Sequence, residues 1–138
     1  MRCSVILMIV AMGLMAGLGG CKSSQSPIFF TSPSSPFPDV PVPASFTLVS
    51  QGTLAGGGRY TEYLYQSTDA VQPVVNYFSE QMPKRGWVTQ GESSSSGSAI
   101  LKYVKGGEVL QIEVWNGPTI RTNARLRISP APRGATVQ

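Results

Sequence analysis

Carboxylates are the only side chains of this sequence that could act as catalytic acids or bases near neutral pH. The chain contains no histidine, which excludes Ser-His-Asp triads, Cys-His pairs and histidine metal ligands. Its two cysteines cannot form a four-cysteine zinc site. The sequence contains seven side-chain carboxylates: Asp39, Glu62, Asp69, Glu80, Glu92, Glu108 and Glu113.

No two of these carboxylates are placed for acid–base catalysis. Glu108 and Glu113 fall on one expected strand at a separation of five residues, so their side chains face opposite sides of a sheet. Asp69 stands where a helix N-cap is expected, and Glu80 lies away from the apolar face of that helix. We therefore expect no enzymatic activity, no cofactor and no bound metal.

A stripe of arginines near the C-terminus is the most distinctive polar feature. Arg121, Arg125 and Arg127 share one face of an expected strand, and the chain has a formal net charge of +4. One interpretation is a solvated face on which arginine pairs with Glu113 across a hairpin. The other is a basic patch that meets anionic lipid head groups, a polyanionic glycan or an acidic protein partner. Nucleic acid is not an expected partner.

Aromatic residues could extend this face into a binding platform. Tyr63, Tyr65 and Trp115 are the candidates, provided that they fall on the uncovered side of the sheet. Together with the three arginines they form the predicted binding face.

The N-terminus predicts export and a lipid anchor. Met1-Arg2 supplies a positive start, and the run from Val5 to Leu18 is uncharged, as in a secretory signal. The following residues, Leu18-Gly19-Gly20-Cys21, resemble the bacterial lipobox. That resemblance implies cleavage between Gly20 and Cys21 and a diacylglycerol on the Cys21 sulfur. An uncleaved membrane helix is the alternative, but a bilayer span needs about 20 apolar residues and this stretch is shorter.

The composition divides the chain into four parts. Residues 1–20 are the expected lipoprotein signal peptide, 21–43 a lipidated cysteine with a Pro/Ser-rich tether, 44–130 a small domain, and 131–138 a disordered tail. Lys22 in place of Asp favours the outer membrane, facing the periplasm, if the host is Gram-negative. The apolar tether residues Ile28, Phe29, Phe30 and Phe37 could pack onto the domain, enter the bilayer interface or form a docking peptide.

The residues of the domain predict a β-β-α-β-β-β-β order. Strands are expected over residues 46–50, 59–66, 87–92, 99–105, 108–115 and 120–129, with turns at 93–97 and at Gly106-Gly107. Between the second and third strands, one-faced apolar spacing predicts a helix: Val71, Val74, Val75, Phe78 and Met82. The fold class is α+β, an antiparallel sheet of about five to six strands with one amphipathic helix on one face.

The end of that helix carries a recognisable motif, Met82-Pro83-Lys84-Arg85-Gly86-Trp87. With the preceding Pro-rich segment, it resembles a group of small uncharacterised bacterial lipoproteins that share Met-Pro-x-x-Gly-Trp, over about residues 39–130. The layout also resembles the helix-grip domains of outer-membrane assembly lipoproteins, at the level of fold alone. Structurally, the motif predicts that Gly86 takes a positive φ and that Trp87 packs at the start of the next strand.

Taken together, the sequence predicts a lipid-anchored cell-envelope protein. The leading hypothesis is a non-catalytic module that binds another envelope component through its open sheet face. The alternative is a periplasmic lipoprotein that binds a glycan or a small ligand through the arginines and aromatic residues.

Overall fold

The computed structural model describes residues 35–54, 60–119 and 121–132 of the chain. The predicted signal peptide, Cys21 and tether residues 22–34 lie outside the described residues, as do residues 133–138. Within the described ranges, no helix combines the length and the apolar character needed to cross a membrane.

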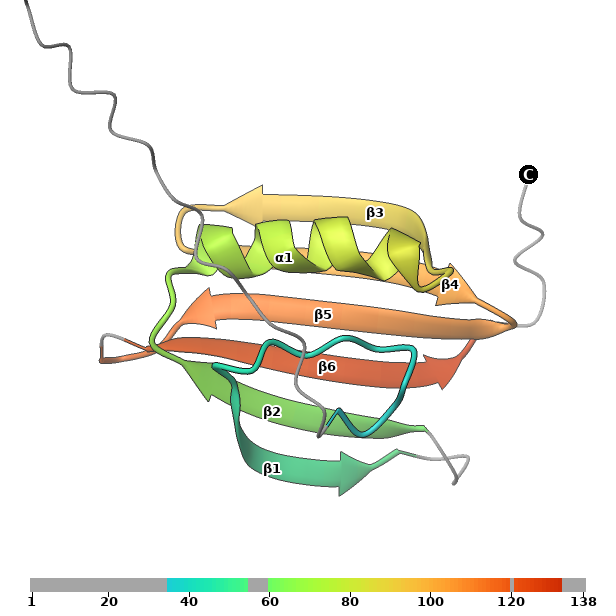
Figure 1. Cartoon of the computed structure of the whole chain (residues 1–138), viewed down its shortest axis with the longest axis horizontal. Coiled ribbons are helices and arrows are strands. Elements are labelled where there is room, and N and C mark those ends of the chain that lie inside the picture. Colours follow the sequence, from blue (N-terminus) through green and yellow to red (C-terminus); the bar gives the residue numbers. More distant parts are fainter. Residues whose placement is uncertain (1–34, 55–59, 120, 133–138) are drawn as a thin grey trace, which may run out of the picture.

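One antiparallel sheet and one helix form the domain, as the sequence predicts (Figure 1). In chain order the elements are β1 (Thr47–Thr53), β2 (Thr61–Ser67), α1 (Val71–Lys84), β3 (Val88–Ser95), β4 (Ser98–Lys105), β5 (Glu108–Asn116) and β6 (Thr122–Pro130). The six strands lie in the order β1-β2-β6-β5-β4-β3. Because α1 carries the chain from β2 to the far edge, the last four strands return as a meander and β6 pairs with β2.

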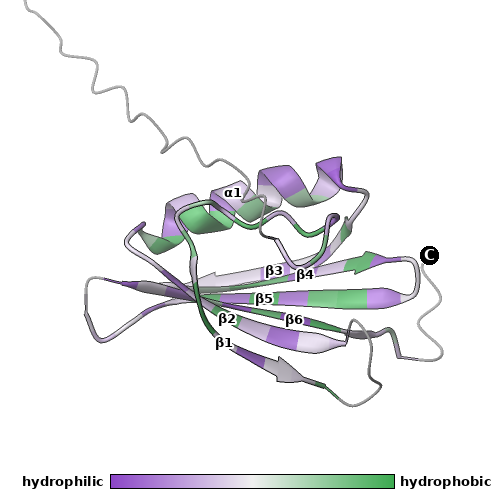
Figure 2. Cartoon of the chain, turned by 60° about the horizontal axis from the view of Figure 1, so that its bottom comes forward, coloured by the Kyte–Doolittle hydropathy of each residue, from purple (hydrophilic) through white to green (hydrophobic). Residues whose placement is uncertain are grey.

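Helix α1 presents its apolar side to the sheet (Figure 2). Val74, Phe78 and Met82 are each fully buried, and the helix contacts β3, β4 and β5. The end motif behaves as expected: Gly86 has φ +83° and Trp87 is 2% exposed. The amide nitrogens of Arg85 and Trp87 both donate to the carbonyl oxygen of Met82, at 3.0 and 3.2 Å, which ends the helix.

Two local predictions need correction. Asp69 does not cap α1, because the N-cap residue is Ala70 and makes no side-chain capping bond. The Asp69 carboxylate instead accepts hydrogen bonds from the hydroxyls of Ser45 and Ser67. These bonds join the chain before β1 to the end of β2. The serine run at 93–97 is not all turn, since β3 continues through Ser95 and pairs with β4 up to Ser95–Ser98.

The larger correction concerns the tether. Residues 35–46, here called the strap, lie over β6 and β2 beside the helix (Figure 1). Val40 and Val42 are each 2% exposed, and the Phe37 ring meets Tyr63 edge-on at 5.9 Å. The helix is too narrow to cover six strands, so the strap covers the apolar side chains of the remaining strands. The packed domain therefore includes strap residues that the predicted boundary at 44 assigned to the tether.

Polar contacts join the strap, the helix end and the end of β4. The Trp87 Nε1–H donates to the carbonyl oxygen of Asp39 at 2.8 Å, and Arg85 Nη1 donates to that of Pro38 at 2.9 Å. Lys105 Nζ, at the end of β4, binds the Asp39 carboxylate at 3.2 Å and the Arg85 carbonyl oxygen at 2.7 Å. Segments far apart in sequence thus meet at one corner of the domain.

Candidate functional site

Side-chain alternation divides the sheet into an inner face, under the helix and strap, and an outer face that they leave uncovered. On β4, β5 and β6 the inner positions are fully buried: Ala99, Leu101, Tyr103, Leu110, Ile112, Val114, Ala124, Leu126 and Ile128. The positions between them form the outer face. Any site built on that face must come from those intervening side chains.

Two of the predicted arginines lie on the outer face, where carboxylates already pair with them. Arg127 Nη2 lies 2.7 Å from Glu62 Oε2. Arg125 bridges two carboxylates, with Nη1 at 3.2 Å from Glu113 Oε2 and Nε at 3.6 Å from Glu62 Oε1. These four residues, Arg127, Glu62, Arg125 and Glu113, are here called the ion-pair ladder. Their two positive and two negative charges offset each other, which favours the paired interpretation over a basic patch.

The other predicted residues divide between the two faces. Trp115 is half-buried on the outer face, and the Arg125 guanidinium carbon lies 5.2 Å from its ring centroid, a cation–π contact. Arg121 is exposed in the turn before β6 and does not join the ladder. Tyr63 and Tyr65 point to the inner face, 7% and 5% exposed, with Phe46 packed against Tyr65. Tyr63 and Tyr65 therefore do not lie on the uncovered side of the sheet, as a role in the binding face would require, because the odd-numbered residues of β2 face the strap.

Burial changes the acidity of Tyr65. Desolvation, together with the neighbouring Tyr63, raises the pKa of the Tyr65 phenol from 10.0 to about 12. Removal from water also raises the pKa of Tyr103, aided by the Glu92 charge, while a hydrogen bond with Ser79 lowers it. Neither phenol is placed to act as a base at neutral pH.

Tyr65 therefore makes the domain sensitive to alkali. Its folded-state pKa is raised, so folding is undisturbed by this group below about pH 10 and is progressively destabilised as pH rises from about 10 to about 12. The full effect is about 2–3 kcal/mol of unfolding free energy. Between pH 9 and pH 12, we expect the unfolding free energy measured with urea to fall by about 2–3 kcal/mol less in Tyr65→Phe than in the native chain. Equal losses in the two proteins would contradict this expectation, because lysine deprotonation is common to both.

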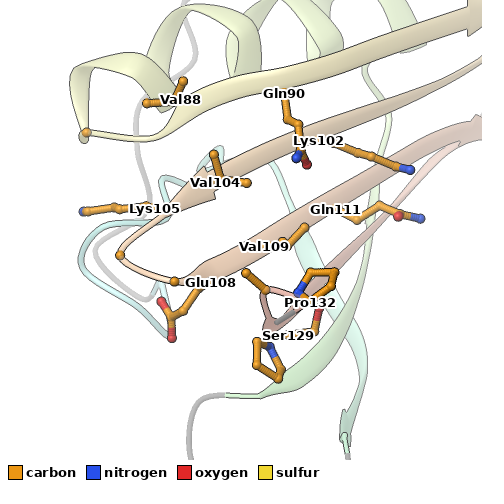
Figure 3. A pocket seen from close by; sticks show the side chains of 15 residues that line it. Val88, Gln90, Lys102, Val104, Lys105, Glu108, Val109, Gln111, Ser129 and Pro132 are labelled. Atoms are coloured by element: carbon orange, nitrogen blue, oxygen red, sulfur yellow. The ribbon is translucent and has the colours of Figure 1, made fainter. Parts of the chain in front are cut away.

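A hollow of about 710 Å³ opens on the outer face near the β4–β5 turn (Figure 3). Its valine side chains come from three neighbouring strands: Val88 from β3, Val104 from β4 and Val109 from β5. The chain leaving β6, Pro130 to Pro132, forms one wall, and the Ala131 amide nitrogen holds it by donating to the Gly107 carbonyl oxygen at 2.8 Å. Val88 is 59% exposed, so this floor is apolar surface left open to solvent.

Polar side chains line one side of this hollow. Lys102 and Gln111 are opposite each other in the β4–β5 register, and Gln90 lies on β3 (Figure 3). Gln111 donates through Nε2 to Glu113 Oε1 at 2.6 Å, which connects the hollow to the ion-pair ladder. An apolar floor with a few polar groups at one side is the usual composition of a small-molecule site.

Sequence reasoning missed this hollow. Its signal was present, because Val104 and Val109 are apolar residues at positions whose neighbours on the same face are polar. What could not be read from the sequence was that three strands and the chain after β6 would place these side chains together. Among the described residues, no group of three or more Asp, Glu, Cys or His side chains could hold a metal ion.

A family profile described as START domain-like matches residues 48–120, just over half of the chain. The chain belongs to the START domain-like family. The match covers the elements from β1 to β5 and ends before β6, so the strap and the arginines of the ladder lie outside it. No curated protein and no solved structure gives a significant match to the chain. In this START domain-like chain the side chains beneath the helix form a packed core, and a hollow of about 350 Å³ lies beside Phe46, Tyr63 and Tyr65 at the strap. The larger hollow described above lies on the opposite side of the sheet.

Proposed function

We propose that this protein is a lipid-anchored, non-catalytic module of the bacterial cell envelope that binds a small ligand in the outer hollow. The observation that carries the proposal is the solvent-open valine floor under a proline wall, with polar groups at one side. Membership of the START domain-like family supports it, because such domains are generally binding modules. The ion-pair ladder argues against the arginines as the ligand contact, since Glu62 and Glu113 already occupy them.

Binding in the outer hollow can be tested with an uncharged amphiphile, octyl glucoside, used below its micelle-forming concentration. We expect its addition to shift the backbone amide resonances of β3, β4 and β5 around Val88, Val104 and Val109. Val104→Asn should weaken binding about fivefold, because a polar amide replaces apolar floor. The control is Val49→Asn, a more exposed valine on β1, 50% exposed, that lies outside the hollow. Shifts confined to Tyr63, Tyr65 and Phe46 would place the site on the inner face and contradict the proposal.

The anchor rests on the lipobox resemblance at Cys21, and the second cysteine provides its control. In cells grown with radiolabelled palmitate, we expect the native chain and Cys3→Ser to carry the label and Cys21→Ser to carry none. Label retained by Cys21→Ser would remove the lipid anchor from the proposal.

Binding of an envelope protein through the same open face is the second candidate. The observation that favours it is Ile100, 40% exposed on β4, which adds apolar surface beyond the hollow. A photo-crosslinker at Arg125, with one at Glu80 on the exposed side of α1 as control, should then give one dominant protein adduct from Arg125 alone. The absence of such an adduct would leave the small-ligand proposal as the better one.

A further inference from the structure

We infer that the outer hollow and a neighbouring hollow form one groove for a single anionic amphiphile, whose head group lies against Lys102. The inference rests on the proposed function and deepens it by naming the chemical class of the ligand. It is carried by the continuity of the two hollows, by the charge balance of the outer face and by the concave shape of the site.

The two hollows meet at Lys102. The second hollow, of about 300 Å³, is lined by the β3 residues Gly91, Glu92 and Ser93 and by Ile100. Lys102 and Gln111 line both hollows. On β4, Lys102 lies between the exposed Ile100 and Val104 of the valine floor, so apolar parts of one ligand could extend to either side of its ammonium group.

Among the described residues of β4, β5 and β6 on the outer face, Lys102 is a cation that forms no ion pair with a carboxylate. Arg125 and Arg127 are paired with Glu62 and Glu113, and Lys105 binds Asp39. In the described part of the chain, no carboxylate oxygen lies within ion-pair distance of the Lys102 ammonium group. Two acidic residues line the groove: Glu108, which pairs in register with Lys105 at the turn end, and Glu92, on β3. An anionic group beside Lys102 would form an ion pair with its ammonium group.

The shape favours a detached amphiphile over the surface of a membrane. Attraction to an anionic bilayer needs several uncompensated basic residues on an accessible surface. On the described outer face of β4, β5 and β6, Lys102 instead stands beside a ladder whose charges cancel. The valine side chains lie in a hollow that Pro130–Pro132 wall on one side, a concave shape that suits a single molecule better than a flat surface.

Two probes that share an octyl chain but differ in head group test this inference. They are octyl phosphate and octyl glucoside, both used below their micelle-forming concentrations. We expect the full chain to bind octyl phosphate more tightly, and Lys102→Met to weaken that binding about fivefold while leaving octyl glucoside binding unchanged. Lys84→Met, which removes an exposed lysine from the end of α1, is the matched control and should change neither. Added salt should reduce the preference for the phosphate probe.

The outcomes separate the two proposals. Equal binding of both probes, with no effect of Lys102→Met, would overturn the anionic ligand but leave the outer hollow as a binding site. Absence of binding for both probes would overturn the proposed function and this inference with it. Sedimentation with anionic phosphatidylglycerol vesicles, without binding of monomeric octyl phosphate, would show a membrane-surface contact and overturn the detached ligand.

Discussion

Replacing Trp87 with alanine is expected to lower the unfolding free energy by about 4 kcal/mol, enough to leave a small domain marginally folded. The side chain is 2% exposed and is among the largest fully buried groups of the core. Its removal would leave a cavity between the helix end and the strap. It would also leave the Asp39 carbonyl oxygen without the donor 2.8 Å away and remove the ring that Lys105 Nζ approaches at 5.8 Å.

Two further variants identify the physical cause of this loss. Val88→Ala changes the next residue, which is 59% exposed, and should alter stability by less than about 0.5 kcal/mol. Trp87→Phe retains an aromatic ring but removes the Nε1 donor, so its effect should fall between those of the other two variants. Urea unfolding followed by circular dichroism measures all three. A Trp87→Ala midpoint equal to that of Val88→Ala would contradict the burial of this residue.

Removal of strap residues 35–43 is expected to have an effect of similar or greater size. A chain beginning at residue 35 retains every described strap contact, whereas one beginning at residue 44 loses the buried Val40 and Val42 and the carbonyl partners of Trp87 and Arg85. Burial of two valines and loss of the polar contacts together amount to about 5 kcal/mol. This loss is comparable with the whole stability of many domains.

The two truncations can be compared directly by near-UV circular dichroism and urea unfolding. We expect the chain from residue 35 to show a cooperative transition and the chain from residue 44 to lose fixed tertiary structure around Tyr63 and Tyr65. If both chains unfold at the same urea concentration, the strap is not part of the core and the boundary at 44 predicted from composition would stand.

Local patterns were sufficient for the type and order of the secondary-structure elements, although β3 continues through Ser95, where a turn was predicted. The spacing of Val74, Phe78 and Met82 predicts the helix because a helical face repeats every three to four residues. Alternation predicts the strands and their faces, and Gly106-Gly107 predicts the hairpin turn, at φ +56° and +78°. The capping prediction for Asp69 was wrong because its carboxylate accepts hydrogen bonds from the hydroxyls of residues 2 and 24 positions earlier in the sequence. A capping rule considers only the adjacent backbone amides and does not take such partners into account.

The sequence by itself thus determined the order of the elements, the apolar face of the helix and the alternation of arginines with core residues, because each depends on neighbours within a few residues. Only the tertiary structure decided how those faces are used. A single helix is too narrow to cover a six-stranded sheet, so residues 35–46 pack onto the part that the helix leaves open. Tyr63 and Tyr65 are buried beneath these residues. Strand register set Arg125 and Arg127 against Glu62 and Glu113, and it left Lys102 beside an open valine floor. These outcomes depend on pairings between residues that are distant in sequence, so no local pattern could specify them.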